Sequence, residues 1–114
     1  MASPIQTDAK HIYPEKVYQE QWCKAHQGII EYRLKDNSRI DCLTEEYAIE
    51  FDFANKWAEA IGQSLYYGLM TCKKPGIVLI IENENKDIKH LKRLQEVAKS
   101  NNITIWITTN KELY

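Results

Sequence analysis

Residues 76–82 read GIVLIIE, with five consecutive aliphatic side chains between a glycine and a glutamate. A continuously apolar strand, without the alternation of a half-exposed strand, is typical of a position that is covered on both faces of a sheet. Helices must then pack on both sides of that sheet. This segment therefore predicts an α/β fold and constrains the rest of the chain to supply the covering helices.

The remaining segments supply them in the order α-β-β-β-α-β-α-β. The first helix begins at a proline and ends at a glycine, as is usual for helix termini. Three strands joined by short turns predict an antiparallel meander, and the second helix allows a right-handed parallel crossover. We expect a mixed sheet with helices on both faces. The expected helices span 14–28, 55–71 and 86–100, and the expected strands 28–34, 39–43, 47–53, 76–82 and 103–108.

Length, charge and cysteine usage limit the class of protein. A chain of 114 residues with a net charge of −1 can form one core, so we expect an irregular lead-in at 1–13 and a single domain at 14–114. No apolar run approaches the ~20 residues that span a bilayer. The start, MASPIQTDAK, does not resemble a secretion signal, although a signal removed earlier would leave no trace. The three cysteines are odd in number and far apart, which favours a reduced, cytoplasmic chain with buried thiols.

Two strands carry acidic residues in a pattern that sets their register. If Glu45-Glu46 is a two-residue turn, Cys42 lies opposite Ile49, and one apolar face forms from Ile40, Cys42, Ile49, Phe51 and Phe53. The other face then holds two charged pairs. Arg39 opposite Asp52 is an ordinary attractive pair, worth ~0.2–1 kcal/mol. Asp41 opposite Glu50 is a repelling pair at ~5 Å, which either takes up a proton, binds a divalent cation, or is exposed and tolerated.

The helix that follows begins near the end of the acid-bearing strand. Lys56, Gln63 and Tyr67 fall on one stripe at 100° per residue, opposite a side with Trp57, Ile61, Leu65 and Leu69 that we expect to face the core. Asn55 can cap the helix. Gly62 costs ~1 kcal/mol against alanine in mid-helix, which predicts close packing there. Taken alone, the polar stripe is better explained as a half-exposed helix face that meets solvent.

Together, the segments RID (39–41), IEFD (49–52) and GQSLYY (62–67) on this order of elements resemble the PD-(D/E)XK nuclease superfamily. The resemblance covers roughly residues 15–82 and is nearest to branches with a Q-x-x-x-Y motif, here Gln63 and Tyr67. It implies a restriction-endonuclease-like core with a C-terminal α-β extension. It further implies that Asp41 and Glu50 hold Mg²⁺ or Mn²⁺, with Glu20 or Glu31 as an additional acid, and that the chain hydrolyses phosphodiester bonds of nucleic acid, with DNA expected.

The chain departs from that motif two residues beyond the second acid. The motif has a lysine there, and this chain has Asp52. A lysine would orient water and stabilise developing negative charge, and Lys56 could supply it from the following helix. Asp52 is then either a further metal ligand or the partner of Arg39, and we favour the second role.

Nucleic-acid binding requires local positive charge, because the chain as a whole is slightly acidic. The expected contacts are Lys73, Lys74, Lys86, Lys89 and Arg93. Each group also has a plain structural explanation, as a helix end or a solvated helix face. The alternative function is a catalytically inactive nuclease fold that binds nucleic acid or a protein. Because the final strand, ITIWIT, offers an edge, a homodimer is also expected to be feasible.

Overall fold

The computed structural model describes residues 10–113, in which the predicted order of helices and strands is present. Residues 10–13 contain no helix or strand, and the rest of the predicted lead-in, 1–9, lies outside the described residues. None of the helices in residues 10–113 is both long and apolar enough to cross a bilayer. The elements are α1 (Glu15–Ala25), β1 (Ile29–Arg33), β2 (Arg39–Leu43), β3 (Tyr47–Phe53), η2 (Ala54–Lys56), α2 (Trp57–Thr71), β4 (Lys74–Ile81), α3 (Glu84–Asn101), β5 (Thr104–Thr109) and η3 (Asn110–Glu112).

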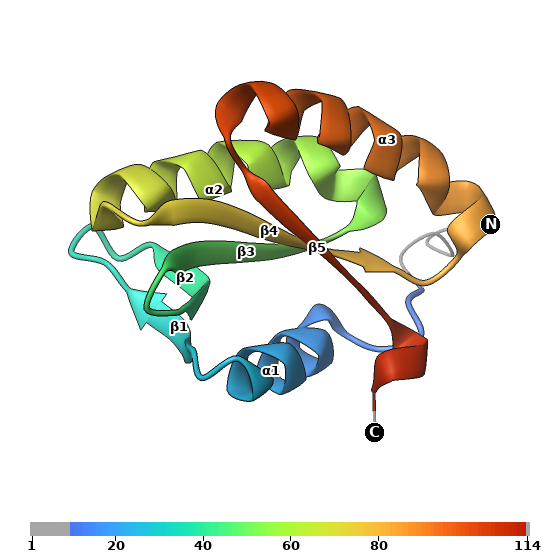
Figure 1. Cartoon of the computed structure of the whole chain (residues 1–114). Helices are drawn as coiled ribbons and strands as arrows, with labels where there is room; N and C mark the ends of the chain where they lie inside the picture. Colours follow the sequence, from blue (N-terminus) through green and yellow to red (C-terminus); the bar gives the residue numbers. More distant parts are fainter. Residues whose placement is uncertain (1–9, 114) are drawn as a thin grey trace, which may run out of the picture.

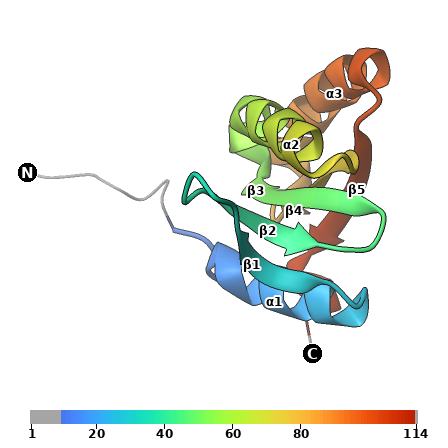
Figure 2. The same cartoon turned by 90° about the vertical axis from the view of Figure 1, so that its left-hand side faces the viewer.

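The sheet is covered on both faces, as the apolar segment of β4 predicts. Figure 1 shows α2 and α3 above the sheet and α1 below it, and the turned view in Figure 2 shows the same layers. Side chains of β4 alternate between the two cores: Ile77 and Leu79 pack in the cluster with α2 and α3, and Val78 and Ile80 pack with α1. A strand with two buried faces has no position for a polar residue, which explains its continuous aliphatic sequence.

The sheet is mixed, with the strand order β1-β2-β3-β4-β5. The pairs β1–β2 and β2–β3 are antiparallel, and β3–β4 and β4–β5 are parallel. The expected meander followed by parallel crossovers is confirmed. The last strand, β5, is an edge of this sheet, as predicted.

The predicted register of β2 and β3 is confirmed where the two strands pair, at Cys42 with Ile49 and Leu43 with Ala48. Cys42, Ile49 and Phe51 share the core beneath α1, with Phe53 packed against it. Ile40 does not join them, because it packs with Ala48 and Tyr67 toward α2. The change of face occurs around Asp41, whose neighbour in β1, Glu31, has a left-handed backbone (φ 56°). A local distortion of this kind re-aims side chains that a regular alternation would keep on one face.

Three expectations for the second helix are wrong. Asn55 does not cap it: Asn55 lies in η2, and the N-cap of α2 is Lys56. Gly62 does not mark close packing, because a Cβ placed there would have no neighbour within 4 Å among the described residues. Leu69 is 75% exposed and does not face the core, whereas Trp57, Ile61 and Leu65 do pack against it. The residues that α2 buries most completely are three small ones, Ala60, Ser64 and Gly68, together with Tyr67.

The cysteines also differ from expectation. Cys23 of α1 and Cys42 of β2 form a disulfide, with Cα atoms 5.8 Å apart, and the third cysteine, Cys72, is exposed. The predicted burial is confirmed for Cys23 and Cys42, but their predicted reduced state is wrong, whereas Cys72 is a free thiol as predicted but is not buried. The two bonded cysteines are separated by 19 positions in the sequence, and they lie where α1 packs against β2. Only the packing of α1 against β2 brings them together.

Candidate functional site

Asp41 of β2 and Glu50 of β3 approach each other, as the register predicts. Each carboxyl group shifts the pKa of the other, and a hydrogen bond joins their side chains. Asp41 also accepts a hydrogen bond from the backbone N–H of Phe51 through Oδ2, at 2.8 Å. This hydrogen bond fixes the carboxylate of Asp41 against β3, next to Glu50. Glu50 itself is only 6% exposed.

The two carboxyl groups do not ionise independently. Burial raises the pKa of Asp41, while the N–H of Phe51 opposes that shift by stabilising its anion. Burial and the charge of Asp41 raise the pKa of Glu50 further. The hydrogen bond between them favours the proton on Glu50 and the negative charge on Asp41. The pair therefore holds a proton well above the usual range of a carboxylic acid, and its titration belongs to both residues.

Asp52 belongs to this cluster and is not the partner of Arg39. Arg39 lies 3.6 Å from Glu31, measured from Nη1 to Oε1, so the predicted Arg39–Asp52 pair is wrong. Asp52 is 7% exposed, and burial together with the charges of Glu59 and Asp41 raises its pKa to about 7. Lys56 opposes the shift. The side chain of Lys56 therefore lies close enough to the acids to act on them, as the sequence hypothesis requires.

Glu15, at the start of α1, is an acid that the sequence did not single out. Burial and the charges of Asp41 and Asp52 raise its pKa to about 8, whereas Lys56 lowers it. Glu20, the predicted helix acid, is exposed and lies 3.9 Å from Lys16 instead. We call Glu15, Asp41, Glu50 and Asp52 the acid cluster. The one indication in the sequence was that Glu15 follows Pro14 at the first turn of a helix, a position from which a carboxylate points off the helix end.

Glu31, the other predicted additional acid, lies at the border of the cluster. Its charge raises the pKa of Asp41 and Glu15. Its own carboxylate accepts a hydrogen bond from Gln19 Nε2 at 2.8 Å and lies near Arg39. The same Gln19 amide also donates to the backbone carbonyl of Asp41, at 3.0 Å. Gln19 therefore ties α1 to both β1 and β2 next to the acids.

The two residues of the Q-x-x-x-Y motif have different surroundings. Tyr67 is 6% exposed, and burial followed by the charges of Glu50 and Asp41 raises its pKa, so its hydroxyl lies in the field of the acid pair. Gln63 is exposed, one turn earlier on α2. The motif thus contributes one buried phenol beside the acids and one amide at the surface.

The predicted nucleic-acid contacts separate into two groups. Lys73 donates to the backbone carbonyls of Thr44 and Glu45 at 2.8 and 2.6 Å, and Lys74 lies 2.9 Å from Glu46. These two lysines fasten the turn between β2 and β3. Lys86 and Lys89 instead line a cavity at the start of α3, and Arg93 is exposed one turn further along this helix.

The fit of a cation to the acid cluster depends on what neutralises its charge. Glu50 Oε1 is buried and has no hydrogen-bond partner within residues 10–113. Four carboxyl groups with raised pKa values lie in this part of the molecule, and Lys56 lowers the pKa of two of them, Glu15 and Asp52. Over the same residues, no set of three His, Cys, Asp or Glu side chains is placed to enclose a metal ion by itself. The donors present are hard oxygen ligands, the kind that Mg²⁺ prefers when water and phosphate complete its shell.

Comparison with known proteins gives one informative relationship. The chain is 32% identical over 94 residues to a KilA-N domain-containing protein of Acanthamoeba polyphaga mimivirus. The match covers 82% of this chain and spans a quarter (25%) of the length of that relative. No family model matches the chain, and no solved structure matches it.

Proposed function

We propose that this protein binds nucleic acid, with DNA as the expected substrate, and hydrolyses its phosphodiester bonds with Mg²⁺ held at the acid cluster, as a member of the PD-(D/E)XK nuclease superfamily. The observation that carries the proposal is the buried Asp41–Glu50 pair, in which Glu50 Oε1 has no partner among residues 10–113. Repelling carboxylates in a buried site reduce stability unless a proton or a cation neutralises them. A divalent cation accounts for both the repulsion and the unpartnered oxygen.

Asp41 and Glu50 would hold the metal, with Asp52 or Glu15 as a further ligand. Mg²⁺ commonly uses one or two carboxylates and completes its shell with water and substrate phosphate, so a closed protein cage is not required. Bound there, the ion supplies Lewis-acid stabilisation of the phosphate and a more acidic water. The opposing strands and Gln19 fix the position of Asp41, so the ligand geometry is largely set before substrate arrives.

The surrounding residues have separate roles in this proposal. Lys56 lowers the pKa of Glu15 and Asp52 and can stabilise negative charge that develops on the phosphate. Tyr67 closes the α2 side of the site, where its buried ring excludes water from the acid pair. Where Glu15 is not a metal ligand, its deprotonated form can accept a proton from the attacking water, and its pKa of about 8 makes that form available above neutral pH.

Two further findings support this assignment. An antiparallel β1-β2-β3 meander followed by parallel β4, with acids on β2 and β3 beneath α2, agrees with the order implied by the resemblance. The relationship to a KilA-N domain-containing protein favours DNA binding, although the shared segment spans only a quarter of that relative.

The test compares metal uptake and cleavage in matched variants. Calorimetry with Mg²⁺ or Mn²⁺ on intact protein should show binding that is lost in Asp41→Asn and Glu50→Gln and retained in Glu20→Gln. Cleavage of plasmid and single-stranded oligonucleotides should follow the same pattern. Metal uptake that is unchanged in Asp41→Asn would contradict the site, and uptake without cleavage of any nucleic acid would contradict the reaction.

The second candidate is a catalytically inactive nuclease fold that binds nucleic acid. Asp52 at the position of the motif lysine favours it, because an acid there cannot stabilise negative charge. This candidate predicts nucleic-acid binding in EDTA, unchanged by Asp41→Asn, with no cleavage in Mg²⁺ or Mn²⁺. Nucleic-acid binding in EDTA and cleavage in Mg²⁺ or Mn²⁺, measured on the same variants, therefore distinguish the two functions.

A further inference from the structure

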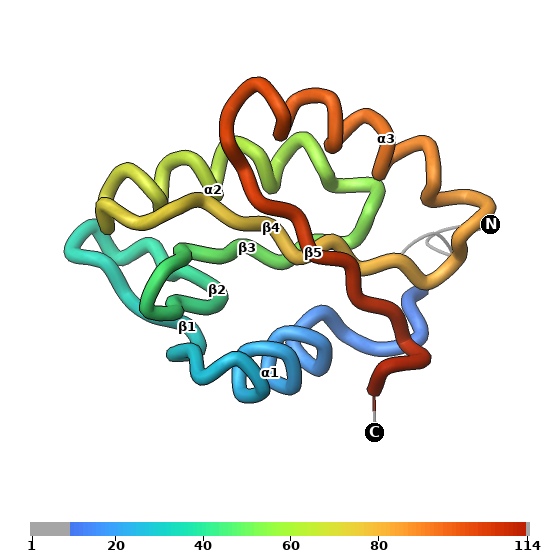
Figure 3. Tube along the Cα trace, viewed as in Figure 1, coloured from blue at the N-terminus to red at the C-terminus, as the bar shows by residue number. Residues whose placement is uncertain are grey.

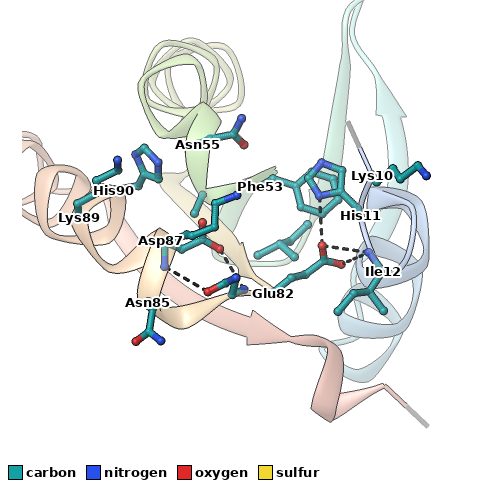
Figure 4. Close-up of a pocket in the computed structure, with 14 residues that line it drawn as sticks. Lys10, His11, Ile12, Phe53, Asn55, Glu82, Asn85, Asp87, Lys89 and His90 are labelled. Carbon is teal, nitrogen blue, oxygen red and sulfur yellow. Dashed lines mark hydrogen bonds and ion pairs between the residues drawn. The ribbon is translucent and has the colours of Figure 1, made fainter. Parts of the chain in front are cut away.

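A cavity of about 470 Å³ opens at the carboxyl ends of β3 and β4, beside the start of α3. Figure 4 shows His11 and Phe53 on one side, His90 and Asp87 of α3 on the other, and Asn55 above. Its volume lies within the usual range of ligand sites, and the carboxyl ends of parallel strands are where α/β sheets commonly bind ligands. We call this cavity, lined also by Lys86 and Lys89, the α3 pocket.

One wall of the α3 pocket is held by an internal network. Glu82, directly after β4, accepts hydrogen bonds from the backbone N–H groups of Ile12 and Tyr13 at 3.1 and 3.2 Å, from His11 Nδ1 at 3.1 Å, and from the Tyr18 hydroxyl. The ring of His11 stacks on Phe53 with centroids 3.4 Å apart. The trace in Figure 3 shows the segment ahead of α1 lying near the end of β4. The wall is therefore fixed before any ligand enters.

This network also changes the charge that a ligand would meet. Lys10, Lys86 and Lys89 line the pocket, together with the acids Glu82 and Asp87. Both Glu82 oxygens already accept hydrogen bonds, so its charge is compensated from within. Within residues 10–113, neither Lys86 nor Lys89 forms an ion pair. The charge left for a ligand is positive.

The α3 pocket adjoins the acid cluster along the chain. Phe53, Ala54 and Asn55 line it, and they are the residues between Asp52 and Lys56. This adjacency allows a nucleic-acid strand with one phosphate at the acid cluster to place a neighbouring phosphate at the pocket. Lysine ammonium groups bind phosphate as point charges, and the amides of Asn55 and Asn85 can donate to its oxygens.

We propose that the α3 pocket binds a phosphate group of the nucleic-acid strand next to the scissile linkage. The adjacency to a scissile linkage rests on the proposed function, whereas phosphate binding by the pocket does not. The phosphate is either a terminal monoester or an internal diester, and these share the chemistry that Lys86 and Lys89 recognise. A terminal phosphate would make the chain act from strand ends, and an internal one would make it act within strands.

The test is an NMR titration of ¹⁵N-labelled protein in EDTA, so that no cleavage occurs. The probes are inorganic phosphate, thymidine 5′-monophosphate and the dinucleoside monophosphate of thymidine. We expect amide shifts at 53–55 and 82–90, with affinity at least tenfold weaker in Lys86→Ala/Lys89→Ala. The matched control is Lys92→Ala/Lys99→Ala, which removes the same charge from α3 outside the pocket.

A salt series with an oligothymidine adds an independent measure. Each phosphate that is no longer neutralised should reduce the slope of log Kobs against log[salt] by about 0.7, and the pocket is proposed to hold one phosphate, so the slope of the pocket variant should be smaller by about 0.7. Tighter binding of the monophosphate than of the dinucleoside supports a terminal-phosphate site, and equal binding supports an internal one. Absent shifts, or equal weakening in both double variants, would overturn the pocket. Because EDTA removes the metal, this experiment tests phosphate binding by the pocket independently of metal binding at the acid cluster. Either proposal can therefore be refuted while the other stands.

Discussion

Replacing Glu50 by glutamine should make the metal-free protein more stable at pH 8. Two unit charges ~5 Å apart at an effective dielectric constant of ~20 repel by ~3 kcal/mol. Partial protonation of the pair already relieves some of this repulsion, so we expect the free energy of unfolding to increase by ~1–3 kcal/mol. The amide of glutamine keeps the shape of Glu50 and can still donate a hydrogen bond to Asp41.

The effect should depend on pH with a defined sign. A carboxyl group whose pKa is raised in the folded state binds protons more tightly when folded, so its contribution is present below the unfolded pKa and is lost as pH rises through the folded pKa. With the pKa of Asp52 at about 7 and that of Glu15 at about 8, metal-free wild type should lose stability between pH 4 and pH 8. At pH 4, Glu50→Gln and wild type should unfold at nearly the same temperature.

Magnesium should stabilise wild type more than Glu50→Gln at pH 8 and so reduce the difference in stability between the two proteins. If the dissociation constant is ~1 mM, 10 mM Mg²⁺ stabilises wild type by ~1.4 kcal/mol, and each kcal/mol corresponds to ~4 °C or more in Tm for a domain of this size. Glu50→Gln should gain far less. Thermal unfolding followed by circular dichroism, in EDTA and in Mg²⁺ at pH 4 and pH 8, measures the Tm of both proteins under these four conditions.

The control for these measurements is Glu20→Gln, an exposed acid of α1 whose nearest cation is Lys16. It should change Tm little under any of the four conditions. The reasoning would be refuted if Glu50→Gln were less stable than wild type by a similar amount at pH 4 and pH 8, or if Mg²⁺ raised the Tm of both proteins equally. Either result would mean that the two carboxylates do not repel in the folded protein or that no cation binds between them.

Three further predictions concern other parts of the molecule. Lys56→Ala should slow oligonucleotide cleavage by ~10²–10³-fold, since it removes the cation beside the acids, while calorimetric Mg²⁺ affinity stays within a few-fold of wild type; an equal loss of both would contradict a role in charge stabilisation. Gly76→Ala should lower the free energy of unfolding in urea by ~1–3 kcal/mol, because its Cβ would lie 2.7 Å from Trp106. Gly62→Ala should raise the free energy of unfolding by ~0.5–1 kcal/mol, and a decrease instead would mean that Gly62 does pack closely. Cys23→Ser should lower the free energy of unfolding by ~3 kcal/mol, as expected for a disulfide that closes a loop of this size, and Cys72→Ser is the near-neutral control. Equal unfolding curves of wild type with and without reductant would show that the disulfide does not form in solution.

Local patterns predicted the fold of this chain well. The five aliphatic residues of β4 required cover on both faces, and the pairing of Cys42 with Ile49 followed from a two-residue turn between alternating strands. A slip of one residue would place every acid in the core, so the alternation alone fixes this register. The same register also predicted that Asp41 and Glu50 meet, which is the central feature of the candidate site.

Most of the predictions that were wrong depend on contacts between elements. Arg39 contacts Glu31, and not Asp52, on a stretch where β1 has a left-handed residue and Ile40 turns toward α2. Periodicity assumes regular strands, so it cannot anticipate such a distortion. Gly62 was expected to pack closely because glycine is costly in a helix, yet the space beside it is open. The low helix propensity of glycine does not reveal which residues, if any, pack against that position of the helix.

The sequence by itself determined the order of the elements, the sheet register and the repelling pair, because alternation, turn length and apolar runs act between near neighbours. Only the tertiary structure decided that Glu15 joins the acids in place of Glu20, that Cys23 meets Cys42, and that a pocket lined by lysines lies next to the acid cluster along the chain. These outcomes depend on how α1 and α3 are placed against the sheet. That placement is set by the packing of whole faces, and no short segment encodes it.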